Sequence, residues 1–195
     1  MSRSRKVTPE SAIQAAQALF WKHGYCSLGT RQIEEETGLT RFTLQTSYGG
    51  KKALFLKTLD AYLAEFETMI SAPDITSGLD GLATWFTTRA NPQKMPDVGR
   101  YGCLMLNSIV EFQGQDAEIN TRSDRYFSLL RDSFRLALSN ARTDNKLSHD
   151  FDIEGKADTL LGVILGMNII IRAADDNVAA APMGKATAAM IRAWS

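Results

Sequence analysis

Apolar residues recur every three or four positions through most of the chain, which is the spacing of one face of an α-helix. Short segments that contain proline or glycine separate these periodic stretches. The pattern therefore predicts an all-α protein. The predicted helices span residues 9–23, 31–37, 41–48, 51–71, 77–90, 100–113, 116–140 and 153–174, and a last helix starts near Pro182. Residues 72–76, 91–99 and 141–150 are predicted to be loops.

Within this pattern, residues 30–52 predict two short helices joined by a tight turn. Thr40 suits the N-cap of the second helix, because its hydroxyl can accept a hydrogen bond from a free backbone N–H group. Gly49 and Gly50 end that helix, since glycine enters the left-handed conformation without steric cost. The two helices are predicted to bury a small shared face formed by Ile33, Leu39, Leu44 and Tyr48.

Two helices joined by a turn of this length form a helix-turn-helix unit, whose second helix enters the major groove of DNA. Arg41 and Gln45 are one turn apart on that helix, as are Phe42 and Thr46, so each pair shares a face different from the buried one. The candidates for contact with bases or with the DNA backbone are Arg41, Phe42, Thr43, Gln45 and Thr46. The candidates for holding phosphates are Thr30, Tyr48, Lys51 and Lys52.

The residues around this unit carry further motifs. They are ALF-x-x-x-GY at residues 18–25, RxI at residues 31–33, TGLTR-x-TL at residues 37–44, and the exit Gly50, Lys51 and Leu54. Together these motifs resemble the N-terminal domain of the TetR family of transcriptional regulators, and the resemblance is specific over roughly the first quarter of the chain. It implies a three-helix DNA-binding domain followed by a helical domain that binds a ligand and dimerises.

Two positions depart from the pattern of the family. The family usually has a tyrosine that contacts phosphate where Gln45 stands, and a small residue where Glu34 stands. Gln45 can still form two hydrogen bonds with the major-groove edge of an adenine, so the change is predicted to alter the target sequence and puts phosphate contact at this position in doubt.

The net charge is zero, which by itself argues against a nucleic-acid-binding protein. The charges are unevenly distributed, however: residues 1–52 hold eight basic and four acidic residues, a net charge of +4, and residues 53–195 carry −4. This asymmetry favours a phosphate-binding head on an acidic body. Arg3, Arg5 and Lys6 precede the first helix, either as an arm that follows DNA or as a solvated tail.

The helix predicted at residues 51–71 links the two parts. Its N-terminal end would lie beside the second helix of the helix-turn-helix, where Lys51, Lys52 and free backbone N–H groups can clamp a phosphate. Its other end would lie in the rest of the protein, so one rod would contact both DNA and the body. We predict a helix-turn-helix DNA-binding domain at residues 1–50 and a ligand-binding and dimerisation domain at residues 51–195.

The last two helices have more apolar surface than one small body needs to cover. Gly162 and Gly166 stand one turn apart, and glycine inside a helix costs about 1 kcal/mol relative to alanine, which favours another helix packing close to that strip. The sequence thus predicts a homodimer in which these two helices meet the same pair of a second chain around a two-fold axis. The alternative is a central core helix with an ordinary cap helix.

The second domain also has aromatic and isolated polar residues at inward-facing positions, which fit either plain core or the walls of a ligand cavity. By the family resemblance, an apolar ligand would lie among the middle helices and displace the long connecting helix. The candidate ligand-binding residues are Trp85, Phe86, Cys103, Asn107, Phe112, Tyr126, Phe127, Phe134 and Asn168. Cys103 lies in GCLMLN, which resembles a branch of the family where some members sense reactive electrophiles; a buried inert thiol is the alternative.

No catalytic motif is found, and His23 and His149 stand apart in the sequence, so we predict neither an enzyme nor a cofactor or metal site. The two cysteines are distant and lack a CxxC pattern, which favours neither a disulfide framework nor zinc. We expect no apolar run long enough to cross a bilayer, and the polar start carries no signal-peptide core. These features predict a cytoplasmic protein without membrane association.

These observations predict a ligand-responsive transcriptional regulator that binds double-stranded operator DNA as a homodimer. The operator would be near-palindromic, the expected sign of regulation is repression, and a small apolar or reactive effector would release the DNA. The alternative is a helical ligand-binding or interaction protein that no longer binds DNA specifically.

Overall fold

The computed structural model describes residues 8–195, and every regular element in that range is helical. This confirms the predicted all-α class. The helices are α1 (Pro9–His23), α2 (Thr30–Thr37), α3 (Arg41–Tyr48), α4 (Lys51–Ile70), α5 (Pro73–Thr76), α6 (Leu79–Arg89), α7 (Leu104–Phe112), α8 (Ala117–Thr143), α9 (Ile153–Ala174) and α10 (Ala181–Arg192), with 3-10 turns η1 (Asp97–Tyr101) and η2 (Asn177–Ala180). The basic arm expected from Arg3, Arg5 and Lys6 lies outside the described residues.

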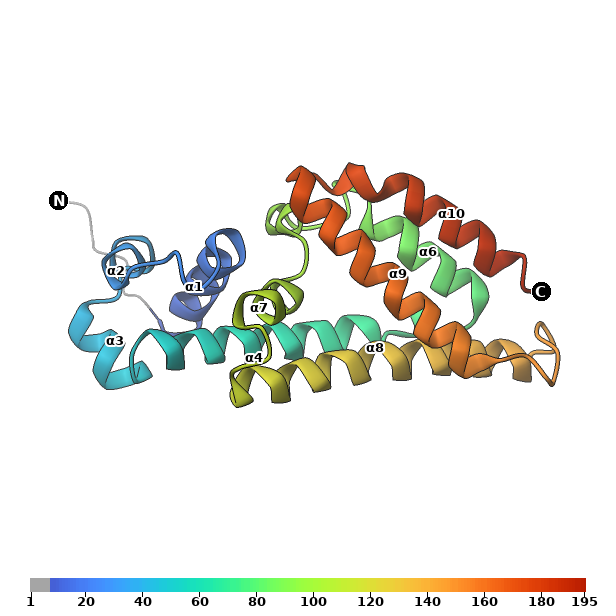
Figure 1. The fold of residues 1–195 in the computed structure, drawn as a ribbon, viewed down its shortest axis with the longest axis horizontal. Helices are drawn as coiled ribbons and strands as arrows, with labels where there is room; N and C mark the ends of the chain where they lie inside the picture. Colours follow the sequence, from blue (N-terminus) through green and yellow to red (C-terminus); the bar gives the residue numbers. More distant parts are fainter. Residues whose placement is uncertain (1–7) are drawn as a thin grey trace.

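Helices α1 to α3 form a small head at one end of the molecule, and α4 runs from this head into the body beside α8 (Figure 1). Helices α6, α9 and α10 cover the far end of the body. Helix α10 lies close against α6, because a Cβ atom added at Gly184 would stand only 2.7 Å from the carbonyl oxygen of Phe86. The absence of a side chain at Gly184 therefore allows the two helices to pack this closely.

Local capping explains the boundaries of the helices in the head. The hydroxyl of Thr8 accepts a hydrogen bond from Ser11 N at 3.2 Å, and that of Thr40 accepts one from Thr43 N at 3.1 Å. Gly38 and Gly49 end α2 and α3 in the left-handed conformation, with φ of 72° and 82°. The predicted cap at Thr40 and the predicted stop at Gly49 are confirmed.

One continuous apolar core runs through the head and the body. Helix α4 contributes to it along its whole length, from Leu54 to Ile70, and both of these side chains are fully buried. Because α4 packs against α1 and α3 and also against α8, the head shares its main helix with the body. The division at residue 50 stays a prediction about domains.

Three of the predicted boundaries are wrong. Helix α8 continues to Thr143, into the segment 141–150 that is predicted to be a loop. Residues 72–76 were expected to be a loop, but Pro73 occupies the first turn of α5 and Asp74 follows it, and both residues are favourable at that end of a helix. The helix expected at residues 100–113 starts only at Leu104, because Gly102 has a φ of 74° and Cys103 has extended backbone as the N-cap. The expected bounds of α9, with Asp152 as its cap, are confirmed.

Helix α9 also corrects the expectation that no apolar run is long enough to cross a bilayer. By length and composition alone it could cross a membrane, since its 22 residues include an 18-residue window of mean hydropathy 1.5. In the fold it packs against α8, with Ile164, Met167 and Ile171 buried. Only 39% of that window is buried, so much of this apolar helix lies on the surface of the single chain.

Candidate nucleic-acid interface and internal pocket

The outer face of α3 presents side chains that the rest of the described chain does not cover. Arg41, Gln45 and Thr46 are exposed, and Phe42 is 76% exposed although it is a large apolar residue. Arg41 forms no ion pair with any residue in the range 8–195. The face therefore combines a free cation, an amide and an aromatic ring on two neighbouring turns of one helix.

The opposite face of α3 holds the helix on the head. Ile33 of α2, Leu39 of the turn and Leu44 of α3 are buried, as the spacing predicted. Tyr48 is only 9% exposed, and its hydroxyl lies 3.5 Å from the carbonyl oxygen of Pro9. Tyr48 therefore braces α3 against α1, which differs from the phosphate-facing position expected for it, because the ring fills an apolar site in the head.

The threonines of this region have different surroundings. Thr30 is exposed at the start of α2, whose N-cap Gly29 supplies no side-chain hydrogen bond, so backbone N–H groups are free there. Thr43 is half-buried, and its hydroxyl lies 2.9 Å from that of Thr40. The hydroxyl of Thr46 donates to the carbonyl oxygen of Phe42 at 2.8 Å, which leaves its oxygen and its methyl group facing solvent.

Lys51 and Lys52 open α4 but differ in what they contact. The Nζ atom of Lys51 lies 4.2 Å from the centroid of the Tyr25 ring. The Nζ atom of Lys52 lies 2.6 Å from Asp116 Oδ2 and 3.1 Å from Glu118 Oε2, at the start of α8. Hydrogen bonding to Lys52 lowers the pKa of Asp116, and the same contact raises the pKa of Lys52. Lys52 is thus paired with the body, and this pairing competes with the phosphate contact predicted for it.

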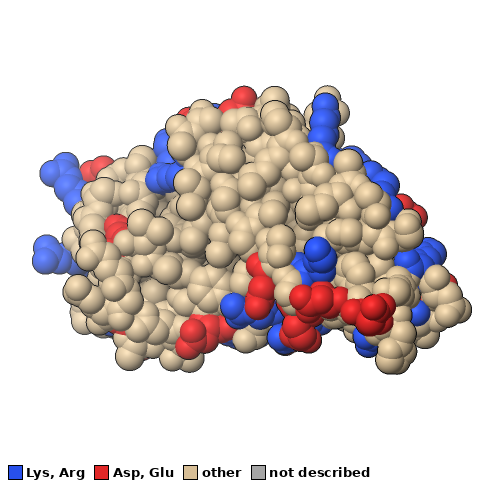
Figure 2. Space-filling view, turned by 45° about the vertical axis from the view of Figure 1, so that its right-hand side comes forward, with Lys and Arg blue, Asp and Glu red and all other residues tan. Residues whose placement is uncertain are grey.

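Figure 2 shows how the charges are distributed on one face of the molecule. Lysine and arginine side chains project from the left-hand end, whereas acidic side chains gather along the lower edge together with further basic ones. A broad area in the middle of this face carries no charge.

Most of the aromatic residues proposed as ligand contacts are core residues. Phe86, Tyr126 and Phe134 are at most 1% exposed, and the rings of Phe86 and Phe134 lie 5.8 Å apart. Phe112 packs instead against Phe55 at the junction with the head, with ring centroids 5.8 Å apart. The prediction that these residues point inward was correct, but they fill space rather than line a cavity. Phe127 is half-buried beside Tyr126.

A pocket of about 600 Å³ lies between α4, α6 and the segment before η1. Of the residues proposed from the sequence, Trp85 alone lines it. The other walls include Trp21, Tyr62, Phe66, Met69, Arg89 and Met95. Sequence reasoning missed them because they come from separate segments, and helical periodicity does not reveal which segments meet.

The two proposed asparagines bond to the backbone. Asn107 Nδ2 donates to the carbonyl oxygen of Tyr101 at 2.9 Å, and Asn168 Nδ2 donates to that of Ile164 at 3.0 Å. Asn168 Oδ1 is buried without a hydrogen-bond partner in the described chain. Neither residue lines the pocket at Trp85, so these amides support helix packing.

Cys103 is 1% exposed and lies between two tyrosines. Its Sγ atom is 3.2 Å from the hydroxyl of Tyr62 and 3.3 Å from that of Tyr126. Burial raises the pKa of both tyrosines well above 10.0, and the adjacent Cys103 raises it further. A thiol enclosed in this way fits the alternative of an inert buried cysteine, since a reactive one needs access to its reagent.

Several polar contacts join the head to the body. Glu111, near the end of α7, accepts hydrogen bonds from the backbone N–H groups of Tyr25 and Cys26, at 2.8 and 2.6 Å. Arg172 of α9 donates to the carbonyl oxygens of Trp21 and Lys22 at the end of α1. The body therefore holds the C-terminal end of α1 from two sides.

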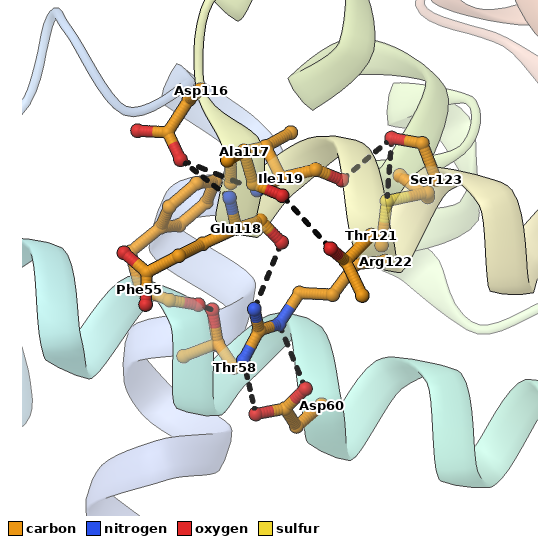
Figure 3. Close-up of polar contacts among 11 residues, drawn as sticks. Phe55, Thr58, Asp60, Asp116, Ala117, Glu118, Ile119, Thr121, Arg122 and Ser123 are labelled. Carbon is orange, nitrogen blue, oxygen red and sulfur yellow. Dashed lines mark hydrogen bonds and ion pairs between the residues drawn. The ribbon is translucent and has the colours of Figure 1, made fainter.

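Helix α4 is attached to α8 by a second set of contacts. Arg122 places two guanidinium nitrogens 2.8 Å from the two carboxylate oxygens of Asp60 and donates to the carbonyl oxygen of Glu118 (Figure 3). A two-point contact of this kind fixes direction as well as distance. Together with the Lys52–Asp116 pair, it sets the position of α4 along α8.

A helix-turn-helix with an outward-facing second helix, joined by a long shared helix to a helical body, is the architecture of a DNA-binding regulator. Comparison with known proteins identifies the family of regulators. The family description "Bacterial regulatory proteins, tetR family" matches residues 12–58, and "Tetracyclin repressor-like, C-terminal domain" matches residues 78–189. The chain belongs to the TetR family of transcriptional regulators.

Relatives and solved structures agree with this assignment. The HTH-type transcriptional repressor ComR of Escherichia coli strain K12 is 26% identical over 174 residues, which cover 87% of this chain and 82% of ComR. A TetR family regulator from Cytophaga hutchinsonii has the same fold with a TM-score of 0.82 at 15% identity, covering 95% of this chain and 94% of that one. CifR, a TetR family regulator solved with 26-bp double-strand operator DNA, gives a TM-score of 0.72 at 20% identity over the whole of both chains.

Proposed function

We propose that this protein is a repressor that binds a near-palindromic operator as a homodimer and releases it when a small apolar effector binds the body. The observation that carries the proposal is the outer face of α3, where Arg41, Phe42 and Gln45 are exposed. An exposed helix of this kind fits the width of a major groove, and its N-terminal residues would meet base edges.

The side chains of α3 suit different parts of the groove. The guanidinium of Arg41 can bond the O6 and N7 atoms of a guanine, and the amide of Gln45 the N6 and N7 atoms of an adenine. The exposed ring of Phe42 suits the methyl group of a thymine. Thr43 and Thr46 would border these contacts. Tyr48 would not contact DNA, because it is buried in the head.

Phosphates would be held at two helix ends beside α3. Lys51 and the uncapped N–H groups at the start of α4 form one such site, since Gly50 supplies no side-chain cap. The uncapped start of α2, with Thr30, forms the other. Lys52 would contribute less, because Asp116 and Glu118 already neutralise it.

A second copy of the chain would cover the exposed face of α9. Ile169 and Ile170 are 57% and 39% exposed there, and a Cβ atom added at Gly162 would meet nothing within 4 Å. Met190 extends the apolar surface onto α10. Four helices meeting around a two-fold axis would bury these side chains and would set the two heads about 34–36 Å apart, or at a multiple of that distance.

The pocket at Trp85 is the proposed effector site, because its walls belong to elements that also position the head. Trp21 comes from α1, and its Nε1 atom donates to the carbonyl oxygen of Gly102 at 3.2 Å. Tyr62 comes from α4, whose other end lies beside α3. An effector that binds one arrangement of these helices more tightly than another would shift the spacing of the heads. The enclosure of Cys103 favours an effector that binds without reacting.

The names of two relatives support the proposal. ComR is a transcriptional repressor, and CifR was solved with operator DNA. The test is selection of bound duplexes from a random DNA pool, followed by titration at rising salt. The proposal predicts a two-fold-symmetric sequence that is bound more tightly than random duplex, with affinity that falls as salt rises. Failure to bind random duplex even at low salt would favour the alternative, a ligand-binding or interaction protein without DNA binding.

A further inference from the structure

The pocket at Trp85 contains a cation that the fold does not neutralise. Arg89 is the last residue of α6, and its side chain extends along the pocket wall, with Cζ 6.0 Å from the centroid of the Trp85 ring. Its Nη1 atom donates a hydrogen bond to the thioether sulfur of Met95 at 3.6 Å, and this is its one hydrogen bond among the described residues. Its Nε atom is buried and has no hydrogen-bond partner within residues 8–195.

No carboxylate in the described part of the chain forms an ion pair with Arg89. The acidic residues of the pocket, Glu65 and Asp74, are exposed, as is Lys94. A buried or half-buried guanidinium is costly to desolvate, and a thioether is a weak acceptor that returns little of that cost. The negative end of the α6 dipole offsets only part of it. Arg89 therefore has donor capacity that the protein leaves unused.

Apart from Arg89, these three charged residues, Thr84 and Thr88, the walls of the pocket are apolar or aromatic. Trp21, Tyr62, Phe66 and Ile75 supply rings and an aliphatic chain, and the volume of about 600 Å³ is that of a site for one small molecule. A ligand that fits must therefore have an apolar body and one anionic end. A planar carboxylate matches the fork of a guanidinium by two parallel hydrogen bonds.

We propose that the pocket takes an apolar carboxylate, with the carboxylate on Arg89 and the apolar body against Trp85 and the walls shared with α1 and α4. This inference rests on the proposed function in one respect, because it assigns a chemical class to the effector of that same site. It predicts that a neutral ligand of the same shape binds more weakly, since the guanidinium then stays without an anionic partner.

The test uses pairs of probes that differ only in charge. Isothermal titration calorimetry at pH 7.5 would compare 2-naphthoate with 2-naphthamide and octanoate with octanamide on the full-length protein. We expect at least one acid to bind about 10- to 100-fold more tightly than its own amide, which is the range for a hydrogen-bonded charge pair. Equal affinity within both pairs, or no binding by either acid, would overturn the proposal.

Variants test whether Arg89 causes the preference for the acid over its amide. Arg89→Met keeps the packing of the stem against Trp85 and should remove the preference for the acid, whereas Arg89→Lys should keep part of it. Arg142→Met, at the exposed end of α8, is the matched control and should keep it. Lys94→Met tests the other cation of the pocket, which is exposed at the rim, and the assignment to Arg89 predicts that the preference remains. A preference that survives Arg89→Met, or is lost with Lys94→Met instead, would contradict the assignment to Arg89. The wild-type comparison of acid and amide does not depend on any variant folding.

A parallel measurement separates this inference from the proposed function. Release of the selected duplex would be followed with each probe. Release by the acid alone supports both proposals. Release by an amide, without a preference for the acid, would keep effector control and overturn the anionic class. Tight binding of the acid that depends on Arg89, without release of DNA, would keep the anionic pocket and contradict effector control.

Discussion

The outer face of α3 and the pocket at Trp85 present their cations in opposite surroundings. Arg41 is exposed on a short helix, beside side chains that extend into solvent. Arg89 is half-buried among tryptophan, tyrosine and methionine side chains. A solvated cation attracts a polyanion over a distance set by salt, whereas an enclosed one selects a single small anion by contact. The two proposals thus assign this chain two anion-binding sites that differ mainly in access to water.

These two regions are connected through α4 and α1. Helix α4 packs on α3 near its start and supplies Tyr62 and Phe66 to the pocket, and α1 supplies Trp21. The polar contacts of Glu111, Arg172 and Arg122 hold these helices on the body. Under the proposed function, changes in the pocket would reach α3 through these two helices. Four changes test how independent the two regions are.

The largest effect is expected from Leu59→Ala, in the fully buried middle of α4. Loss of the side chain should lower the free energy of unfolding by about 2–5 kcal/mol, and head and body should still unfold in one transition because they share this helix. Chemical unfolding followed by circular dichroism would measure both. Leu136→Ala, at a position 49% exposed on α8, is the control and should cost less than about 0.5 kcal/mol. Separate transitions for the head and the body would contradict a shared core.

Gln45→Ala changes the outer face of α3 and leaves the pocket at Trp85 unchanged. Removing the amide should weaken binding to the selected duplex by about 1–3 kcal/mol and leave binding to random duplex nearly unchanged, because phosphate contacts carry no sequence information. Fluorescence anisotropy with both duplexes would show this. An equal loss on both duplexes would mean that Gln45 contacts the backbone, as the tyrosine of its relatives is expected to do.

The buried tyrosines of the body predict a pH dependence of stability. Burial raises the pKa of Tyr62 and Tyr126 above 10.0, so in the unfolded chain these groups lose their protons at lower pH than in the fold. Their contribution is therefore complete below pH 10 and is lost as pH rises further, with at most about 1.4 kcal/mol per pH unit from each tyrosine. Tyr126→Phe should flatten the fall in stability between pH 10 and 11, measured by urea unfolding. An unchanged slope would contradict the enclosed pair around Cys103.

The smallest effect is expected in the salt dependence of DNA binding, where changes at Lys51 and Lys52 should give different results. Lys51→Met should reduce the slope of binding against salt by about one unit, because one phosphate contact is lost. Lys52→Met should leave that slope nearly unchanged, since its ammonium group is paired with Asp116. Titration of random duplex at several salt concentrations would compare the two variants. Equal reductions would mean that Lys52 leaves Asp116 when DNA binds.

The sequence predicts the head well because its structure is local. Thr40 and Gly49 mark the ends of α3, and the spacing of Ile33 and Leu44 separates its buried face from its outer face. Tyr48 was misplaced because its ring belongs to the same buried stripe, which should have taken precedence over a phosphate role. The pairing of Lys52 with Asp116 was not predictable, because the two residues lie far apart in the sequence.

The pocket was not predictable in the same way. Periodicity showed that Phe86 and Phe134 point inward, but an inward-facing position can lie in a filled core or beside a cavity. The difference depends on how α4, α6 and the segment near Met95 come together, which local patterns do not contain. Arg89 ends α6, where basic residues are common because they interact favourably with the helix dipole. Its sequence position therefore gave no sign that its side chain lies in a pocket.

The most direct test of the account is hydroxyl-radical footprinting of the protein on its selected duplex. The account predicts two protected segments on one face of the DNA, about 10 base pairs or a multiple apart and related by two-fold symmetry, with protection weakened at both by Gln45→Ala. A single protected segment, or two segments without symmetry, would contradict a dimer that places one α3 helix in each of two major grooves.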